Sequence, residues 1–307
     1  MVKKYFSKLL LIIFVLLSKC IPNVQSCHNP EAVDLILFNF YINPYQHQVY
    51  NVHNFHEIFN HSSFLRNRNT VIYHYGSSQT ATSSPIVETI DTYLSYGNVN
   101  FVLVNYESIT TNVSGNSCTI GENIAEALIR LFNSGYSPKQ VHLVGFSSGS
   151  TVVAIAGREI ISRSNHQHVI ERITGLDPGQ GREEMRLRIG DAKFTDTVHT
   201  EGVGFGDLNT RGDVQFFVNG GVVQPMCHSL IPHIAWTCSH LFVITLWNES
   251  IRTQHLSFAS LQCESWEHFL HNDCNHNAPV GHIGPFTSSA LRGSYFLETN
   301  LQPPYSK

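Results

Sequence analysis

One segment near the middle of the chain restricts the fold more than any other. Residues 141–144, Val-His-Leu-Val, have the composition of a buried strand, and they run directly into Gly145-Phe-Ser-Ser-Gly149. An apolar helical pattern follows over residues 150–161. A strand, a Gly-x-Ser-x-Gly turn and a helix in this order predict a nucleophile elbow, in which the glycines admit neighbouring segments around a strained serine. Ser147 is therefore the predicted nucleophile.

The elbow belongs to a regular alternation of short apolar runs and helical patterns. Such an alternation is typical of an α/β fold with a mostly parallel central sheet covered by helices on both faces, and together with the elbow it predicts the α/β-hydrolase fold. We expect strands at residues 33–40, 70–74, 99–105, 141–144, 172–176, 193–200 and 214–218. We expect helices at residues 85–94, 122–132 and 150–161. The pattern beyond residue 237 is mixed and predicts no definite element.

The N-terminus has the organisation of a secretory signal peptide. Lysines precede an apolar run at residues 9–17, and the small residues Val24 and Ser26 predict cleavage after Ser26. The apolar run is too short to span a bilayer. Residues 1–26 are thus the predicted signal peptide, and residues 27–307, which contain no recognisable linker or repeat, are predicted to form a single domain. We expect a secreted, extracellular protein.

Charge argues against a polyanionic partner. The chain has 19 basic and 23 acidic residues, and four of the lysines lie in the signal peptide, so its removal lowers the formal charge from −4 to about −8. A net negative charge disfavours binding to nucleic acid, whose phosphates are also negatively charged. We expect no metal and no cofactor. The segment His56-Glu-Ile-Phe-Asn-His61 places its second histidine at i+5, off the helix face that a zinc motif requires.

Six cysteines remain after the signal peptide is removed, an even number that suits an oxidising compartment. Four of them form two local pairs that each enclose ten residues, so the economical pairing is Cys227–Cys238 and Cys263–Cys274, with Cys27–Cys118 left by elimination. Sequons in such a compartment predict surface glycans at Asn60, Asn112 and Asn248.

A serine nucleophile needs a histidine to take its proton and a carboxylate to orient that histidine. In α/β-hydrolases the acid and then the histidine follow the serine along the chain. Asp177, directly after the expected strand 172–176, and Asp196, within the strand 193–200, are both candidate acids, and Asp177 has the better position. Local chemistry does not choose among the downstream histidines, which are His199, His228, His233 and His240.

Several motifs in one order carry a family resemblance between about Thr70 and Cys274. They are Tyr-Ser-Pro-Lys-Gln-Val-His-Leu-Val-Gly-Phe-Ser at 136–147, Ile-Thr-Gly-Leu-Asp-Pro at 173–178, residues 191–200, residues 217–227 and Cys238-Ser-His240. With them the chain resembles the animal pancreatic-lipase family of the AB hydrolase superfamily, especially its insect secreted lipase and phospholipase A1-like members. The resemblance implies a triad of Ser147, Asp177 and His240 that works through an acyl-enzyme.

The two predicted oxyanion donors are the backbone N–H groups of Ser148 and Gly76. The resembled family usually has His-Gly-aromatic in the second loop, whereas this chain has His74-Tyr75-Gly76, and Gly76 takes the donor position. The family's Gly-His-Ser-Leu-Gly-Ala-His is Gly-Phe-Ser-Ser-Gly-Ser-Thr here, with Phe146, Ser148 and Thr151 as departures. In addition, Phe242 replaces a common arginine, and Asn105-Tyr106 replaces a frequent Asp-Trp.

The resemblance also implies a substrate class. In the family, a loop between two cysteines forms a lid, and here Cys227 and Cys238 enclose a short one, which favours a phospholipase A1-like or galactolipase-like enzyme over a strict triacylglycerol lipase. The expected partner is a phospholipid, galactolipid or acylglycerol at a membrane or micelle surface. We expect no C-terminal β-sandwich domain and no colipase-type partner. The alternative is a catalytically weak or inactive lipid-binding or yolk-type protein on the same fold.

Overall fold

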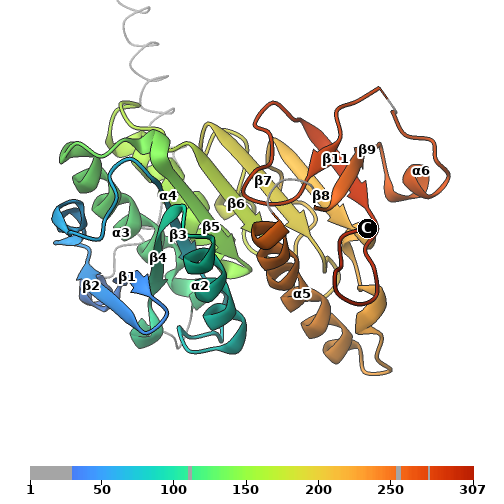
Figure 1. Cartoon of the computed structure of the whole chain (residues 1–307), viewed down its shortest axis with the longest axis horizontal. Helices are drawn as coiled ribbons and strands as arrows, with labels where there is room; N and C mark the ends of the chain where they lie inside the picture. Colours follow the sequence, from blue (N-terminus) through green and yellow to red (C-terminus); the bar gives the residue numbers. More distant parts are fainter. Residues whose placement is uncertain (1–29, 110–112, 254–256, 276) are drawn as a thin grey trace, which may run out of the picture.

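The computed structural model describes residues 30–109, 113–253, 257–275 and 277–307, and its centre is a large mixed sheet (Figure 1). The strands are β1 (Leu37–Asn43), β2 (Gln46–Asn51), β3 (Asn69–His74), β4 (Val99–Asn105), β5 (Val141–Phe146), β6 (Arg172–Leu176), β7 (Phe194–His199), β8 (Val214–Val218), β9 (Ala259–Gln262), β10 (Gly281–His282) and β11 (Gly293–Leu297). They form one 11-stranded sheet in the order β10-β9-β11-β8-β7-β6-β5-β3-β4-β1-β2. The run from β4 to β11 is parallel, and β1, β2, β9 and β10 add antiparallel edges.

Helices occupy several of the connections between the strands. They are α2 (Ser84–Tyr96), α3 (Val113–Asn133), α4 (Ser148–Arg163), α5 (Pro232–Thr253) and α6 (Trp266–Leu270). The crossover from β3 to β4 moves toward one edge of the sheet, whereas those from β4 to β5 and from β5 to β6 move toward the other. Right-handed crossovers in opposite directions place their helices on opposite faces. Accordingly α3 packs against α4, and α2 packs against α5 on the other face (Figure 1).

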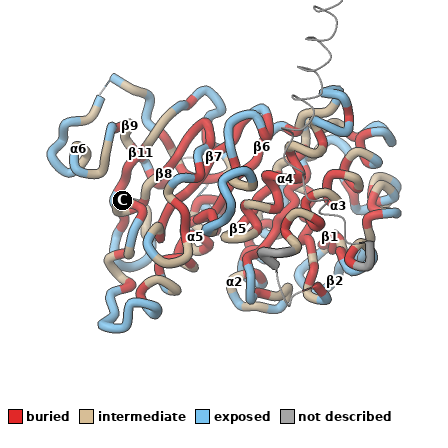
Figure 2. Tube along the Cα trace, turned by 180° about the vertical axis from the view of Figure 1, so that it is seen from behind, coloured by how far each residue is buried: buried red, intermediate tan, exposed pale blue. Residues whose placement is uncertain are grey.

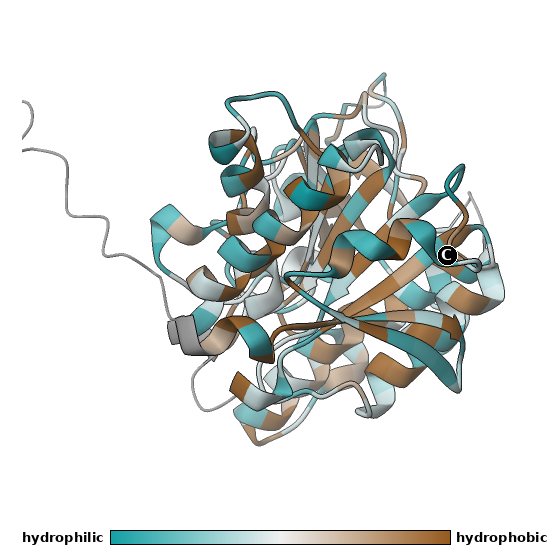
Figure 3. Ribbon diagram, turned by 90° about the vertical axis from the view of Figure 1, so that its left-hand side faces the viewer, coloured by the Kyte–Doolittle hydropathy of each residue, from teal (hydrophilic) through white to brown (hydrophobic). Residues whose placement is uncertain are grey.

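Short 3-10 helices occupy several connections. They are η1 (Pro30–Leu35), η2 (Phe55–Asn60), η3 (Glu107–Ile109), η4 (Pro138–Gln140), η5 (Glu183–Met185), η6 (Asn219–Gly221) and η7 (Pro225–Cys227). Burial runs along the strands, and exposure is concentrated in the loops and on the outer helix surfaces (Figure 2). The hydropathy colouring follows the same division, with hydrophobic residues frequent along the strands (Figure 3). The parallel strands are buried on both faces because helices cover them.

The α/β-hydrolase fold predicted from the sequence is confirmed, and the predicted central elements agree with the structure. The bounds of β4, β6 and β8 match the predicted ranges 99–105, 172–176 and 214–218. The start of the first predicted strand is wrong, because η1 takes up residues 33–35. The sequence also missed α5, whose buried residues occur around most of its circumference, so that it lacks the single apolar stripe by which a helix is recognised.

Two of the predicted disulfides are confirmed, Cys227–Cys238 and Cys263–Cys274, with S–S distances of 2.01 and 2.16 Å. Cys118 is disulfide-bonded as well, and its predicted partner Cys27 lies outside the described residues, as does the predicted signal peptide at 1–26. Within the described residues, no helix is both long and apolar enough to cross a membrane.

The predicted glycosylation sites have three different outcomes. Asn60 ends η2 and is exposed, so it stays a prediction. Asn112 lies outside the described residues. The prediction at Asn248 is wrong, because this residue lies inside α5 with 0% of its surface exposed. An amide nitrogen enclosed by the core offers no space for a glycan.

Candidate active site

Ser147 lies at the sharp turn between β5 and α4. Its backbone has φ 54° and ψ −124°, a strained conformation for a residue with a side chain. The two glycines of the motif are required by close approach. A Cβ on Gly145 would lie 2.3 Å from the carbonyl oxygen of Gly149, and a Cβ on Gly149 would lie 2.5 Å from that of His74. The turn therefore holds the Ser147 side chain at the carboxyl edge of the sheet.

Asp177 follows β6 at the same edge of the sheet and is completely buried. Its Oδ1 accepts hydrogen bonds from the backbone N–H groups of Thr200 at 2.7 Å and Glu201 at 2.9 Å. Burial raises the pKa of the Asp177 carboxyl, and the hydrogen bonds from His240, Thr200 and Glu201 oppose that rise. With Oδ1 held by two donors, Oδ2 is directed at His240.

His240 projects from α5 and joins the other two residues. Its Nδ1–H donates to Asp177 Oδ2 at 2.5 Å, and the Ser147 hydroxyl donates to its Nε2 at 2.8 Å. This tautomer follows from the network, because the buried carboxylate accepts and the serine hydroxyl donates. The rings of Phe146 and Phe205 lie 4.7 and 5.6 Å from the imidazole. The three side chains form a continuous chain from acid to base to hydroxyl.

The other candidates raised by the sequence lie elsewhere. Asp196 is in β7 and forms a buried ion pair with Arg172, at 2.6 Å between Oδ2 and Nη2. His199 hydrogen-bonds to the hydroxyl of Thr197 at 2.8 Å. His228 is exposed in the loop before α5, and His233 packs edge-on against Phe205 at 5.3 Å. Of these groups, only Asp177 and His240 are hydrogen-bonded into one chain with Ser147.

The loop after β3 reaches the nucleophile. A Cβ on Gly76 would lie 2.8 Å from the Cβ of Ser147 and 3.0 Å from the ring of Phe146, so only glycine fits there. The backbone N–H of Gly76, however, donates to Gln79 Oε1 at 3.0 Å. The next N–H, of Ser77, donates to Ser148 Oγ at 3.0 Å. Both loop donors therefore have acceptors from the chain itself.

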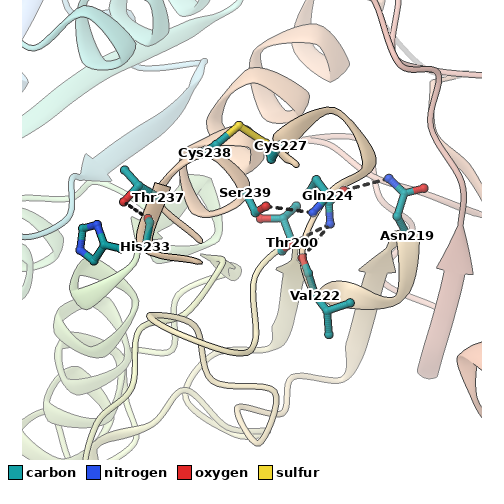
Figure 4. Close-up of a disulfide and its surroundings, with 9 residues drawn as sticks. All are labelled: Thr200, Asn219, Val222, Gln224, Cys227, His233, Thr237, Cys238 and Ser239. Carbon is teal, nitrogen blue, oxygen red and sulfur yellow. Dashed lines mark hydrogen bonds between the residues drawn. A yellow bond between two sulfur atoms is a disulfide. The ribbon is translucent and has the colours of Figure 1, made fainter. Parts of the chain in front are cut away.

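Gln224 is a structural residue of the site that the sequence analysis missed. Its buried carboxamide donates to the carbonyl oxygens of Thr200, Val218 and Val222, at 2.7, 2.9 and 3.2 Å. Its backbone N–H donates to the hydroxyl of Ser239, next to His240, at 2.9 Å. Figure 4 shows this side chain between Thr200 and the Cys227–Cys238 bridge. It links the loop that binds Asp177 to the helix that carries His240.

A second buried acid, Glu201, shapes the loop beside the site. Its carboxylate accepts four backbone N–H groups, from Val203, Gly204, Phe205 and Gly206. Ligand atoms of Asp177, Glu201 and His240 lie within 4.8 Å of one another, which is close enough to consider a metal. Their donors and acceptors are already engaged with each other and with the backbone, so the arrangement fits proton transfer better than ion binding.

Comparison with known proteins identifies the family of the chain. Residues 18–305 match the model of the family described as Lipase. The chain belongs to the lipase family. It is 32% identical over 242 residues to the pancreatic triacylglycerol lipase of Myocastor coypus, covering 69% of this chain and 51% of the relative. It is 30% identical over 284 residues to that of Mus musculus, covering 80% and 59%.

A third relative, the pancreatic lipase-related protein 2 of Mus musculus, is 37% identical over 190 residues, which cover 53% of this chain and 38% of the relative. The chain thus spans about half the length of the curated relatives it matches. Among solved structures, lipase B of Aspergillus fumigatus matches with a TM-score of 0.33 and 17% identity, covering 45% of this chain and 39% of that one. The family assignment rests on the sequence match.

Proposed function

We propose that this lipase-family protein hydrolyses carboxylic esters of lipids, with Ser147 as nucleophile, His240 as general base and acid, and Asp177 as the residue that orients the histidine. The observation that carries the proposal is the hydrogen-bonded chain from Asp177 Oδ2 through the imidazole to Ser147 Oγ, at 2.5 and 2.8 Å. Distances of this size allow the proton transfers that ester hydrolysis requires.

The reaction follows from the positions of these atoms. Ser147 Oγ attacks the ester carbonyl carbon while its proton passes to His240 Nε2, and the carbonyl oxygen becomes an oxyanion. The oxyanion is stabilised by the N–H of Ser148, in the first turn of α4, and by that of Gly76. The C–O bond then breaks, and the leaving alcohol takes the proton from His240. Water repeats the sequence on the acyl-enzyme and releases the fatty acid.

The segment between Cys227 and Cys238 supports a polar lipid as the substrate. Residues 232–238 belong to the first turns of α5, so only residues 228–231 remain as a free loop inside the bridge. Leu230, Ile231 and Ile234 are exposed there, suited to contact with a lipid surface. A loop of this size covers little apolar acyl surface. We therefore propose phospholipase A1-like specificity.

The proposal is tested with purified protein and three substrates: a soluble short-chain ester, phosphatidylcholine and triolein. The Ser147→Ala variant serves as the blank for each. We expect hydrolysis of the short ester and release of the sn-1 fatty acid from phosphatidylcholine at a rate above that for triolein. Triolein turnover above phospholipid turnover would contradict the substrate class. Equal inactivity of both proteins on all substrates would favour the non-catalytic lipid-binding alternative.

Gln79 gives a second prediction, because its Oε1 accepts the Gly76 N–H that the oxyanion needs. A neutral hydrogen bond contributes roughly 0.5–1.5 kcal/mol net, so its removal in Gln79→Ala should raise kcat/KM for a soluble ester about two- to tenfold. Gln79→Glu should lower kcat/KM, because a carboxylate holds the N–H more strongly. Both are measured by steady-state kinetics. A loss of activity in Gln79→Ala would show that the carboxamide assists the reaction.

We also propose that the protein is secreted. The order of charged, apolar and small residues at 1–26 supports export, and the disulfides Cys227–Cys238 and Cys263–Cys274 suit an oxidising compartment.

A further inference from the structure

The peptide unit between Tyr75 and Gly76 carries the second oxyanion donor on one side and the carbonyl group of Tyr75 on the other. A peptide unit is planar, so anything that holds its carbonyl also sets the direction of its N–H. Gly76 lies against Ser147 and Phe146, where that direction determines whether the N–H can reach a bound oxyanion. The contacts of the Tyr75 carbonyl therefore affect how well the Gly76 N–H can stabilise the oxyanion.

Two side chains hold this carbonyl. The Tyr106 hydroxyl donates to the carbonyl oxygens of Tyr75 and Gly76, both at 2.9 Å. His74 Nδ1–H donates to the carbonyl oxygen of Tyr75 at 2.8 Å. Burial lowers the pKa of His74 to about 4, so the ring is neutral at pH 7 and its proton is on Nδ1, facing an oxygen that only accepts. His74, Tyr75 and Tyr106 are all completely or almost completely buried.

An aromatic stack keeps the Tyr106 hydroxyl in place. The Tyr106 ring stacks on His74 and on Tyr75, with ring centroids 4.5 Å apart in both pairs. The Tyr75 hydroxyl donates to Asn105 Oδ1 at 3.1 Å and accepts the backbone N–H of Tyr106 at 3.3 Å. Positions 75–76 and 105–106, at which the chain departs from the usual pattern of the family, are thus in direct contact with each other.

We propose that Tyr106 is a positioning residue for the reaction: its hydroxyl orients the Tyr75–Gly76 peptide so that the Gly76 N–H serves the oxyanion. The inference rests on the proposed ester hydrolysis and goes beyond it by assigning a role to a side chain that does not touch the substrate. Removal of this hydroxyl leaves the Tyr75 carbonyl held by His74 alone, so the direction of the peptide is fixed less firmly. The developing oxyanion then loses part of its stabilisation, while substrate binding is unaffected.

The test is Tyr106→Phe, which keeps the ring and its stacking and removes only the hydroxyl. We expect kcat for a short-chain ester to fall about tenfold with KM unchanged, a fraction of the 10²–10³-fold loss typical when an oxyanion donor is removed outright. Affinity for an alkylboronic acid, which forms a tetrahedral adduct with a nucleophilic serine, should fall by a similar factor.

Tyr136→Phe is the matched control. The Tyr136 hydroxyl is also buried and donates to a backbone carbonyl, that of Arg68, at 2.8 Å, but at the opposite end of β3. We expect this variant to lose thermal stability and keep its kcat. Wild-type kcat in Tyr106→Phe, or equal losses of kcat in both variants, would overturn the positioning role while the proposed function stands. An inactive wild-type protein would overturn the proposed function and this inference with it.

Discussion

Asp177→Asn is expected to lower kcat for ester hydrolysis by about 10⁴-fold, the size of loss that follows when a triad histidine is left in the wrong tautomer. The hydrogen bonds of Asp177 give the reason. Its Oδ1 accepts two backbone N–H groups, so an asparagine must place its own oxygen there. The NH₂ group then faces His240 Nδ1, which has to accept. The imidazole proton moves to Nε2, which faces Ser147. Because Nε2 is then already protonated, it can no longer receive the proton of the serine hydroxyl.

The control for this substitution is Asp196→Asn, which changes the other acid that the sequence raised. Asp196 pairs with Arg172 through two hydrogen bonds of 2.6 and 2.8 Å, and breaking a buried ion pair typically costs about 3–5 kcal/mol. We expect a marked fall in the unfolding temperature and an unchanged kcat at a temperature where the variant remains folded. A large loss of kcat in Asp196→Asn together with a normal kcat in Asp177→Asn would contradict this assignment and make Asp196 the acid of the site.

The second large effect is loss of stability in acid through buried histidines. Burial lowers the pKa of His199 from 6.5 to about 4, and its Nδ1 has no hydrogen-bond partner in the described part of the chain. The unfolded chain binds a proton at this residue below about pH 6.5, whereas the folded chain resists it until about pH 4. The free energy of unfolding therefore falls as the pH falls from about 6.5 to about 4, by about 3 kcal/mol in total. His74, whose pKa is also lowered to about 4, acts in the same direction.

His199→Gln measures this contribution as a difference, because glutamine does not titrate and retains a polar group for Thr197. Urea unfolding of both proteins at pH 7 and pH 4 should show that the variant loses about 3 kcal/mol less stability than the wild type over this interval. The pH dependence of the wild-type stability alone does not isolate the contribution of His199. Burial raises the pKa of Asp191 to about 6, which stabilises the fold as the pH falls and so opposes the histidines. Equal losses in the two proteins would refute the prediction.

The predictions that matched the structure depended on local sequence. The bounds of β4, β6 and β8 came from short apolar runs that any parallel strand buried on both faces must have. The turn at Ser147 was recognised from a short motif in the same way. The atoms that exclude a Cβ are local for Gly145, where they belong to Gly149, whereas for Gly149 they belong to His74 at the end of β3. The missed helix α5 is the counterexample. It is enclosed by its neighbours on most sides, so its residues carry no one-sided pattern.

The site itself depended on contacts between distant segments. Spacing alone left two acids and four histidines open, and the resemblance to a family selected Asp177 and His240. In the structure, 63 residues separate this acid from this base, and 93 separate the base from Ser147. No short-range sequence pattern indicates that residues so far apart in the chain are in contact. The same reason explains the error at Asn248, where a sequon describes three residues and says nothing about the core around them.

The sequence by itself determined the elbow, the mostly parallel sheet and the family, because each is written in short motifs or in their order along the chain. Only the tertiary structure decided which donors are already engaged. It placed Gln79 on the Gly76 N–H and the Tyr106 hydroxyl on the Tyr75 carbonyl, 3.0 and 2.9 Å away. Hydrogen bonds of this kind depend on the direction of individual groups after folding. Residue types in a sequence specify which groups are available, and packing specifies where each one points.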